Sequence, residues 1–516
     1  MPEGCETSAK ASATSSPPPS PVKPKPRVKR VERKQVRLVI VDPERLVEED
    51  HSVRAIWDLL GKLDLSRFYE GIKAVEGRAG REHSDPQVLI ALWLYALSRG
   101  IRQARWLDEW SRYEPGCQWL LDLGHINYHT LSDFVVEYEA ALDELFVQLL
   151  KVLMNEGLAD LERVAHDGTK IRASASRRSF KGEEGLEECK KLAEEHLRAL
   201  KQEAADPPWS AAQRQARKRA AQQRVERLGR AAEELKRQVE QKGKVEGARA
   251  SVSDPEARVM RQGEDGGFAP SYNAQISTDA RHGVILAYAV TQEQEDSQQL
   301  QPALQRIEAN TGQWPKQTLV DGNYTTRENI LETADQPTEL VGSPGKNRSQ
   351  SKLERRGVSP RFMPEQFQFN PEQSCYTCPE GKTLPYQRSK KQVGAIEKHY
   401  QAKASDCAGC PFRSQCCPKA KHGRTLYRTE EDAKVAAFRR QMQQPEYQRT
   451  YRQRAQVAEF SNACLKEKKG LRRFLRRGLV KVRAELGWAC LACNVAIWIR
   501  LHRKITPQPT TRDTCV

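Results

Sequence analysis

The chain has 516 residues, which is enough for two to four domains with cores of their own. With 38% hydrophobic and 30% charged residues, and no run of about twenty apolar residues, it is expected to be soluble and to lack a membrane span. The formal net charge of +17 favours a polyanionic partner, above all nucleic acid, because a basic surface attracts phosphates before specific contacts form. The alternative is a highly charged protein with no nucleic-acid role.

The first 36 residues are rich in Ser, Pro, Lys and Arg and are predicted to form a disordered basic tail. They contain no apolar core of the kind a secretory signal needs. Thirteen cysteines, an odd number in a long chain without an export signal, therefore point to reduced thiols or metal ligands in a cytoplasm.

Residues 42–158 are predicted to form a helical N-terminal domain. In HSDPQVLIALWLYALSRGI the apolar residues recur at three and four, with Ser84, Asp85 and Pro86 as a helix start and Gly100 as its end. A long amphipathic run follows from Thr130 to Asn155. The fold expected for this region is all-helical.

Strands and helices then mix, which predicts an α/β domain with a mixed sheet over residues 159–344 and 430–503. Strand patterns occur in LERVAHDGTKIRASAS and QTLVDGNY, and SYNAQISTDARHGVILAYAVTQ indicates a hairpin that turns near Asp279 and Gly283. Residues 183–244 are predicted to be a charged helical insertion, residues 345–425 an irregular Cys-rich insertion, and residues 504–516 a second disordered tail.

Two aspartates carry the strongest local signal. Asp167 and Asp321 each follow a short apolar strand and precede a glycine. An Asp at the rim of a sheet puts a carboxylate where metals or ligands enter, although Asp-Gly is also an ordinary turn. Asp254, before a proline, and Asp279, at a solvated hairpin turn, rank below them.

The third acid is sought in the final helical region. Glu459 lies among basic residues in YRQRAQVAEFSNACLKEKKG, and helical geometry puts Arg452 and Lys466 on its face with Tyr451 nearby. A carboxylate in this setting is either a plain surface ion pair or a metal ligand flanked by phosphate contacts.

Together these motifs resemble the DDE transposases of bacterial insertion sequences, which share a ribonuclease-H-like catalytic fold. The resemblance covers roughly residues 42–503 and is carried by HSDPQVLIALWLYALSRGIR, VAHDGTKIRASAS, LVDGNYTT and GLRRFLRRGLVKVRAELGWACLACNV, among others. It implies that Asp167, Asp321 and Glu459 ligate two Mg²⁺ or Mn²⁺ ions for DNA cleavage and strand transfer. Hard carboxylate oxygens suit these cations, and a metal pair supports in-line displacement at phosphorus.

The family's terminal signature of Tyr, Arg, Glu and Lys maps onto Tyr451, Arg454, Glu459 and Lys466. Here four residues, rather than the commoner three, separate Arg454 from Glu459, so Arg452 competes for the Arg position. The same resemblance implies a homodimer on double-stranded DNA, with terminal repeats and a target site, in a bacterial cytoplasm beside the nucleoid.

The Cys-rich segment carries two Cys-x-x-Cys pairs, at Cys375–Cys378 and Cys407–Cys410, followed by Cys416 and Cys417. Such pairs favour a structural Zn²⁺ site, with free thiols and an iron–sulfur cluster as alternatives. By resemblance to similar proteins the ligands are Cys378, Cys407, Cys410 and Cys416, with Cys375 as an alternative.

A basic run follows Glu459. Residues 466–483 hold nine Lys or Arg and one acid, with an apolar side for packing. This pattern favours phosphate binding over a merely solvated face. The candidate phosphate ligands in it are Lys466, Arg472, Arg473, Arg476 and Arg477.

Three functions fit these patterns. The first is a transposase that cleaves element ends and joins them to target DNA. The second is a catalytically inactive, transposase-derived DNA-binding protein, which needs only the charge. The third is a metal-dependent nuclease without strand transfer. The intact set of three acids favours the first.

Overall fold

The computed structural model describes residues 36–505 except positions 37 and 39 and the segments 73–82, 203–208, 244–246, 264–265, 345–347 and 419–421. Most of the two predicted disordered tails thus lies outside the described residues. The chain divides into two compact units, Met1–Asp42 and Pro43–Val516, and the elements below all belong to the second.

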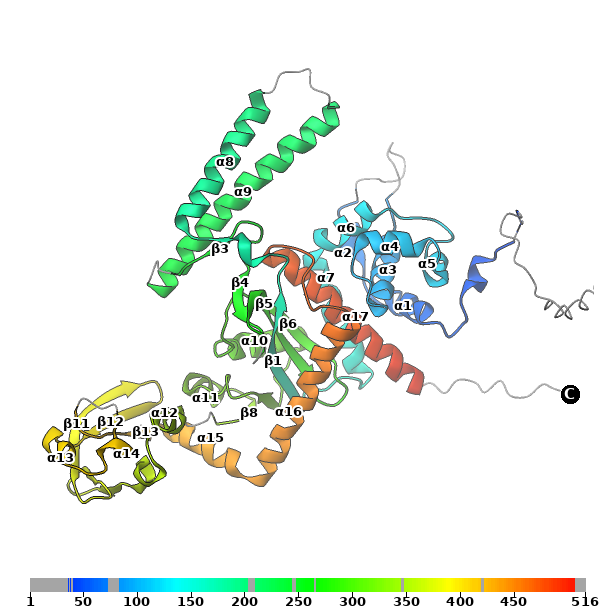
Figure 1. The fold of residues 1–516 in the computed structure, drawn as a ribbon. Helices are drawn as coiled ribbons and strands as arrows, with labels where there is room; N and C mark the ends of the chain where they lie inside the picture. Colours follow the sequence, from blue (N-terminus) through cyan, green and yellow to red (C-terminus); the bar gives the residue numbers. More distant parts are fainter. Residues whose placement is uncertain are drawn as a thin grey trace, which may run out of the picture. The chain divides into compact units, whose positions relative to one another are not determined.

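The region before the first strand is helical, as expected (Figure 1). The start predicted at Ser84–Pro86 is observed: the Asp85 side chain accepts from the Gln87 amide, and the helix ends before Gly100, whose φ is 77°. The long amphipathic run is divided at Tyr138. The helices are α1 (Ser52–Leu60), α2 (Ser66–Tyr69), α3 (Pro86–Ser98), α4 (Ala104–Ser111), α5 (Pro115–Leu120), α6 (Tyr128–Glu137) and α7 (Glu139–Asn155).

The central sheet has the order β6-β5-β1-β7-β8, with β4 also paired to β5. β1 is antiparallel to β5 and parallel to β7, β5 is antiparallel to β6, and β7 is parallel to β8. This is the strand order of a ribonuclease-H-like domain, so the predicted fold class is confirmed. The strands are β1 (Arg163–Arg172), β4 (Arg258–Arg261), β5 (Phe268–Asp279), β6 (Ile285–Thr291), β7 (Gln317–Val320) and β8 (Glu339–Gly342).

Helices pack on the two faces of this sheet. α16 (Pro445–Ala463) crosses β1, β5, β7 and β8, and α10 (Leu300–Thr311) packs on β5 and β6. Because side chains alternate along a strand, the β1 residues that meet α16 are Arg163 and Asp167, whereas His166 faces the other way. α11 (Arg327–Thr333) and α15 (Ala433–Gln443) pack against one another beside the sheet.

The last helix, α17 (Leu479–Ile505), joins the N-terminal helices to the sheet, since it packs against α3, α7 and β6. By length and composition its residues Leu479–His502 could cross a membrane. However, 83% of its apolar window is buried inside the protein, as in a core helix.

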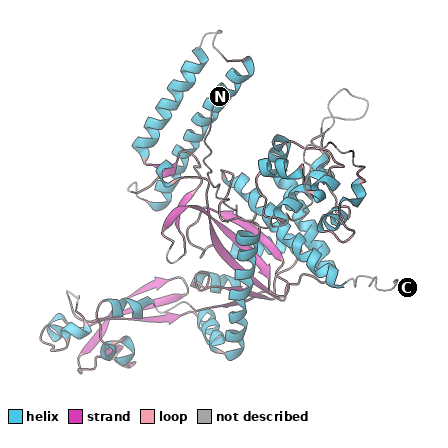
Figure 2. Ribbon diagram, turned by 45° about the vertical axis from the view of Figure 1, so that its right-hand side comes forward, coloured by secondary structure: helices cyan, strands magenta, loops and turns pink. Residues whose placement is uncertain are grey.

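The charged insertion forms two long helices, α8 (Glu183–Gln202) and α9 (Ala211–Lys242), which lie side by side in both views (Figures 1 and 2). They share a small core that includes Leu186, Leu228 and Leu235. At their base β2 (Phe180–Lys181) pairs with β3 (Ala250–Ser251). The break predicted at Asp206–Pro208 lies outside the described residues.

The Cys-rich region is not irregular, which corrects the sequence expectation. It forms a five-stranded antiparallel sheet with a core of its own. Its strands are β9 (Gln368–Asn370), β10 (Cys375–Thr377), β11 (Thr383–Gln392), β12 (Ala395–Gln401) and β13 (Thr425–Glu431), and its helices are α12 (Arg348–Arg355), α13 (Ala404–Ala408) and α14 (Arg413–Cys416).

One pair of cysteines also departs from expectation. Cys464, in a π-helical turn (Cys464–Lys468) after α16, is joined by a disulfide to Cys493 in α17. The sequence analysis expected reduced thiols or metal ligands.

Candidate active site

Asp167 and Asp321 lie next to one another at the edge of the central sheet. The parallel pairing of β1 and β7 ends at Ala165 and Leu319, and counting two residues onward puts Asp167 beside Asp321. Asp321 directly follows β7, as predicted, whereas Asp167 lies within β1 rather than at its end, because β1 continues along β5 to Arg172.

The Asp167 carboxyl is largely buried and bordered by basic and amide groups of α16. Arg454 Nη1 lies 3.7 Å from its Oδ1, and Asn462 Nδ2 donates to its Oδ2 at 3.5 Å. Burial raises the pKa of this carboxyl to about 6; Arg454 opposes the rise and Asp321 adds to it. Two neighbouring carboxylates that repel one another make a site that a cation would stabilise.

Asp321 is oriented by its own turn. Its Oδ1 accepts from the Asn323 amide at 2.8 Å and its Oδ2 from Asn323 Nδ2 at 3.2 Å. This Asx turn places the carboxylate beside the carboxyl of Asp167.

Glu459 lies on the same helix α16, but its side chain is exposed. Asp321 is among the charges that act most on the Asp167 carboxyl, whereas Glu459 is not. The structure therefore brings two of the three predicted acids together, and Glu459 stays a prediction.

Of the two competing arginines, Arg454 approaches Asp167, while Arg452 is exposed. Lys466 is partly buried and within electrostatic reach of Asp167; burial lowers its pKa and Asp167 opposes this. Tyr451 is half-buried and packs against the main core.

Behind Asp167, on the opposite face of β1, lies a polar network that the sequence reasoning missed. Asp296 Oδ1 accepts from Lys170 Nζ at 3.1 Å, Asn273 Nδ2 at 2.6 Å and Gln275 Nε2 at 2.8 Å. Gln275 Oε1 in turn accepts from Tyr324 Oη at 2.7 Å and contacts His166 Nε2 at 2.9 Å. The alternation of β5 is the one sequence signal for it, since Asn273, Gln275 and Ser277 all point to this face.

The two lower-ranked aspartates are both buried. Asp279 was expected to be solvated, which is wrong: it is 0% exposed, and its carboxyl caps the hairpin by accepting from the Arg281 and His282 amides at 3.0 and 2.8 Å. Asp254, also 0% exposed, accepts from Tyr272 Oη at 2.7 Å and from the Gly478 amide at 3.1 Å. Both carboxyls have structural partners.

The basic run begins in the π-helical turn and ends in α17, and its residues 469–478 form the loop between them. Arg472, Arg473 and Arg477 are exposed, whereas Arg476 is partly buried, which lowers its pKa. Arg472 pairs with Glu467 at 2.5 Å, and Arg477 Nε donates to the Ser174 carbonyl at 2.8 Å.

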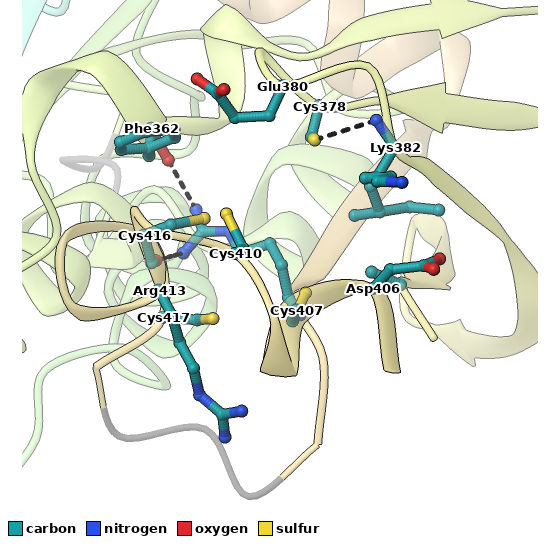
Figure 3. Close-up of a pocket in the computed structure, with 13 residues that line it drawn as sticks. Phe362, Cys378, Glu380, Lys382, Asp406, Cys407, Cys410, Arg413, Cys416 and Cys417 are labelled. Carbon is teal, nitrogen blue, oxygen red and sulfur yellow. Dashed lines mark hydrogen bonds between the residues drawn. The ribbon is translucent and has the colours of Figure 1, made fainter. Parts of the chain in front are cut away.

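Five cysteines line one small cavity in the Cys-rich sheet: Cys378, Cys407, Cys410, Cys416 and Cys417 (Figure 3). Cys375 does not line it; its thiol lies in β10 and contacts Gln373 Oε1. Within the described ranges, no three His, Cys, Asp or Glu side chains are already gathered as a metal site, either here or at the aspartates.

The sheet order and the neighbouring aspartates define a ribonuclease-H-like domain. More particularly, residues 377–498 match the family model described as a transposase DDE domain, a segment that includes Glu459 but neither aspartate. This match supports placing the protein in the general class of DDE transposases.

No curated protein sequence matches the chain. Among solved structures, a cryo-electron microscopy structure of a piggyBac transposase synaptic complex with hairpin DNA aligns with 90% of this chain and 76% of its own, at 9% identity and a TM-score of 0.31. That score is too low to support an argument about fold, which rests instead on the strand order of this chain.

Proposed function

We propose that this protein is a DNA transposase that cleaves the ends of an insertion sequence and joins them to target DNA, using Asp167, Asp321 and Glu459. The observation that carries the proposal is that Asp167 and Asp321 lie side by side beyond the point where the pairing of β1 with β7 ends, beneath helix α16, whose Arg454 faces Asp167. The transposase DDE domain match over residues 377–498 supports it independently.

The residues present fit divalent metal. Asp167 and Asp321 offer hard carboxylate oxygens, and the raised pKa of Asp167 reflects burial and repulsion that a bound cation would offset. With Glu459 they would hold Mg²⁺ or Mn²⁺. A bound pair of such ions supplies activation of the attacking oxygen and stabilisation of the leaving one.

The chain's own residues prepare this site. Asn323 orients the Asp321 carboxylate, and Asn462 and Arg454 border that of Asp167. Arg454 and Lys466 supply positive charge beside the aspartates, where a scissile phosphate would lie.

Glu459 lies between two residues that contact Asp167: Arg454 precedes it by five positions and Asn462 follows by three. Its carboxylate is therefore on the flank of the helix that covers the site. A rotamer change or a small rotation of α16 on binding metal and DNA would complete the triad.

The basic loop at residues 472–478 is proposed to bind DNA phosphates. Its backbone is held by acids: the Leu475 and Arg476 amides donate to Glu485 at 3.0–3.1 Å. At its end, the Leu479 amide donates to Glu256 at 2.7 Å. The side chains of Arg472, Arg473 and Arg477 are exposed, where they can meet a polyanion, although Arg472 also pairs with Glu467.

The base of the helical insertion extends this surface. Arg227 of α9 bonds the Val252 carbonyl at 3.2 Å, and the charges that act on it are those of Arg477, Arg224 and Arg230. Burial lowers its pKa, and these arginines lower it further. Bound DNA would neutralise this concentration of positive charge and stabilise it. We further expect two subunits to act together on paired element ends, in a bacterial nucleoid.

The test is a strand-transfer assay. The protein is incubated with labelled duplexes carrying the element's terminal sequences and a supercoiled plasmid, in Mg²⁺ or Mn²⁺. Labelled ends joined covalently to plasmid support the transposase. Cleaved ends that never join would indicate the nuclease, and binding without cleavage in either metal would indicate the inactive DNA-binding protein.

A further inference from the structure

The thiol-lined cavity of the Cys-rich sheet admits only a very small ligand. Its volume is about 30 Å³, which is roughly the share of one water molecule in the liquid. The five cysteines reach it from three places: Cys378 follows β10, Cys407 and Cys410 lie at α13, and Cys416 and Cys417 end α14 (Figure 3). A single ion fits this space.

Two of the thiols accept backbone hydrogen bonds. The Lys382 amide donates to Cys378 Sγ and the Arg424 amide to Cys407 Sγ, both at 3.3 Å. Such N–H···S contacts orient sulfur for a metal, as hydrogen bonds behind metal ligands generally do.

A buried cation lies against the same cavity. Arg424 is 4% exposed; its Nη1 donates to the Cys416 carbonyl at 2.8 Å and its Nη2 to the Phe362 carbonyl at 2.9 Å. Its Nε has no partner among the described residues. Two acids also line the cavity, Glu380 and Asp406, but Glu380 pairs with Arg361 at 2.7 Å and neither bonds Arg424.

A guanidinium buried without a carboxylate is costly unless another negative charge faces it. The ionisable groups within electrostatic reach of Arg424 are Cys416, Cys417 and Cys407. Four thiolates around one Zn²⁺ carry a net charge of about −2, which a neighbouring guanidinium partly offsets.

We propose that Cys378, Cys407, Cys410 and Cys416 bind one Zn²⁺ as a tetrathiolate centre whose negative charge is balanced by Arg424. Cys416 is taken as the fourth ligand because it lies within electrostatic reach of both Cys378 and Cys407. Cys417 contacts Cys407 and is the competing ligand, which the Cys417→Ser variant below tests. Binding draws the three segments together and fixes α13 and α14 on the sheet. The centre does not depend on the proposed transposase activity.

The first experiment measures zinc by mass spectrometry in the full-length protein purified without chelator. One Zn²⁺ per chain is expected in wild type, Cys375→Ser and Cys417→Ser. Less than a tenth of that is expected in Cys378→Ser, Cys407→Ser, Cys410→Ser and Cys416→Ser. Zinc-free wild type with a native circular dichroism spectrum overturns the proposal, as does zinc retained in any of the four ligand variants.

The second experiment keeps the proposal testable where a ligand variant fails to fold. Wild type refolded with Co²⁺ should give the intense thiolate-to-cobalt absorption of a tetrahedral four-sulfur site. Arg424→Met should still bind zinc but release it to a competing chelator about 10–100-fold more readily, as loss of a group behind metal ligands does. If Arg424→Met releases zinc as slowly as wild type, Arg424 does not balance the charge of the centre. If the cobalt absorption bands are absent, the tetrathiolate site is overturned.

Discussion

At the scale of single residues, the site is built around a glycine. A Cβ on Gly168 would come within 2.4 Å of Asp296 Oδ1 and 2.5 Å of Gln275 Nε2. Only a residue without a side chain therefore lets the Asp296 network close over β1 directly behind Asp167.

Gly168→Ala is expected to lower the free energy of unfolding by about 1–3 kcal/mol, because the added methyl forces Asp296 or Gln275 to move. Urea denaturation measures it. Gly182→Ala is the matched control, since a Cβ there meets nothing within 4 Å. Equal stability of the two variants would mean that the close approach at Gly168 is not a constraint.

A buried lysine gives a prediction with a defined pH dependence. Lys469 is 3% exposed; burial lowers its pKa to about 8, and Lys468 adds to this. Lys469→Met is expected to raise the free energy of unfolding at pH 7 by up to about 3 kcal/mol, since the folded protein holds the proton less well than the unfolded chain. The gain is full below pH 8 and shrinks as the pH approaches 10.5.

Denaturation at pH 7 and at pH 10 would test this, with Lys468→Met as the exposed control. A variant no more stable than wild type at pH 7 would show that the ammonium group has a stabilising partner when folded.

Sequence reasoning found the residues whose neighbours in the chain are distinctive. Asp167 and Asp321 both precede glycine. Asp321 directly follows β7, as expected, whereas Asp167 lies inside the longer β1 and not at its end. Asp296 and Arg424 have no such local pattern. The hydrogen-bond partners of Asp296 lie 21 to 126 positions away in the sequence, and those of Arg424 lie 8 and 62 positions away. Only the folded chain brings them together.

At the scale of elements, the basic loop depends on one buried carboxylate. Glu485 accepts from two loop amides and pairs with Arg102 at 2.5 Å, with both side chains mostly buried. Arg102 also donates to the Arg473 carbonyl at 2.6 Å. The acid therefore holds the loop in shape and attaches it to the N-terminal helices.

Glu485→Gln is expected to cost up to about 3 kcal/mol of stability, because it leaves Arg102 buried without a counter-charge. It is also expected to weaken duplex binding several-fold, which fluorescence anisotropy at a temperature where the variant is folded would detect. Glu467→Gln removes an exposed pair with Arg472 and should change stability by less than about 1 kcal/mol. Similar values for the two variants would contradict the role given to Glu485.

Elements with clear periodicity were predictable and polar ones were not. The helix after Asp85 and the hairpin around Gly283 follow from capping and alternation. The sheet β9–β13 was missed because its longest strand, β11, carries mostly polar and exposed side chains, so no alternation marks it as a strand.

At the scale of the whole molecule, the N-terminal helices and the central sheet share one core, to which α3, α7, β6 and α17 all contribute. The hairpin α8–α9 and the Cys-rich sheet have smaller cores of their own. This arrangement predicts which parts can be removed.

A fragment that begins at residue 159 is expected to be insoluble or unfolded, because it would expose the buried side of α17. Circular dichroism and size-exclusion chromatography would check this. A monodisperse, folded fragment would mean that the sheet does not need the N-terminal helices.

The measurement that tests the central claim most directly is metal-dependent cleavage of end-containing DNA by Asp167→Asn, Asp321→Asn and Glu459→Gln. The control is Glu446→Gln, an exposed acid in the first turn of the same helix α16. The account predicts that each of the three loses at least about 100-fold in cleavage rate while binding DNA normally, and that the control cleaves like wild type. Cleavage retained in the Asp167 or Asp321 variant would contradict the account.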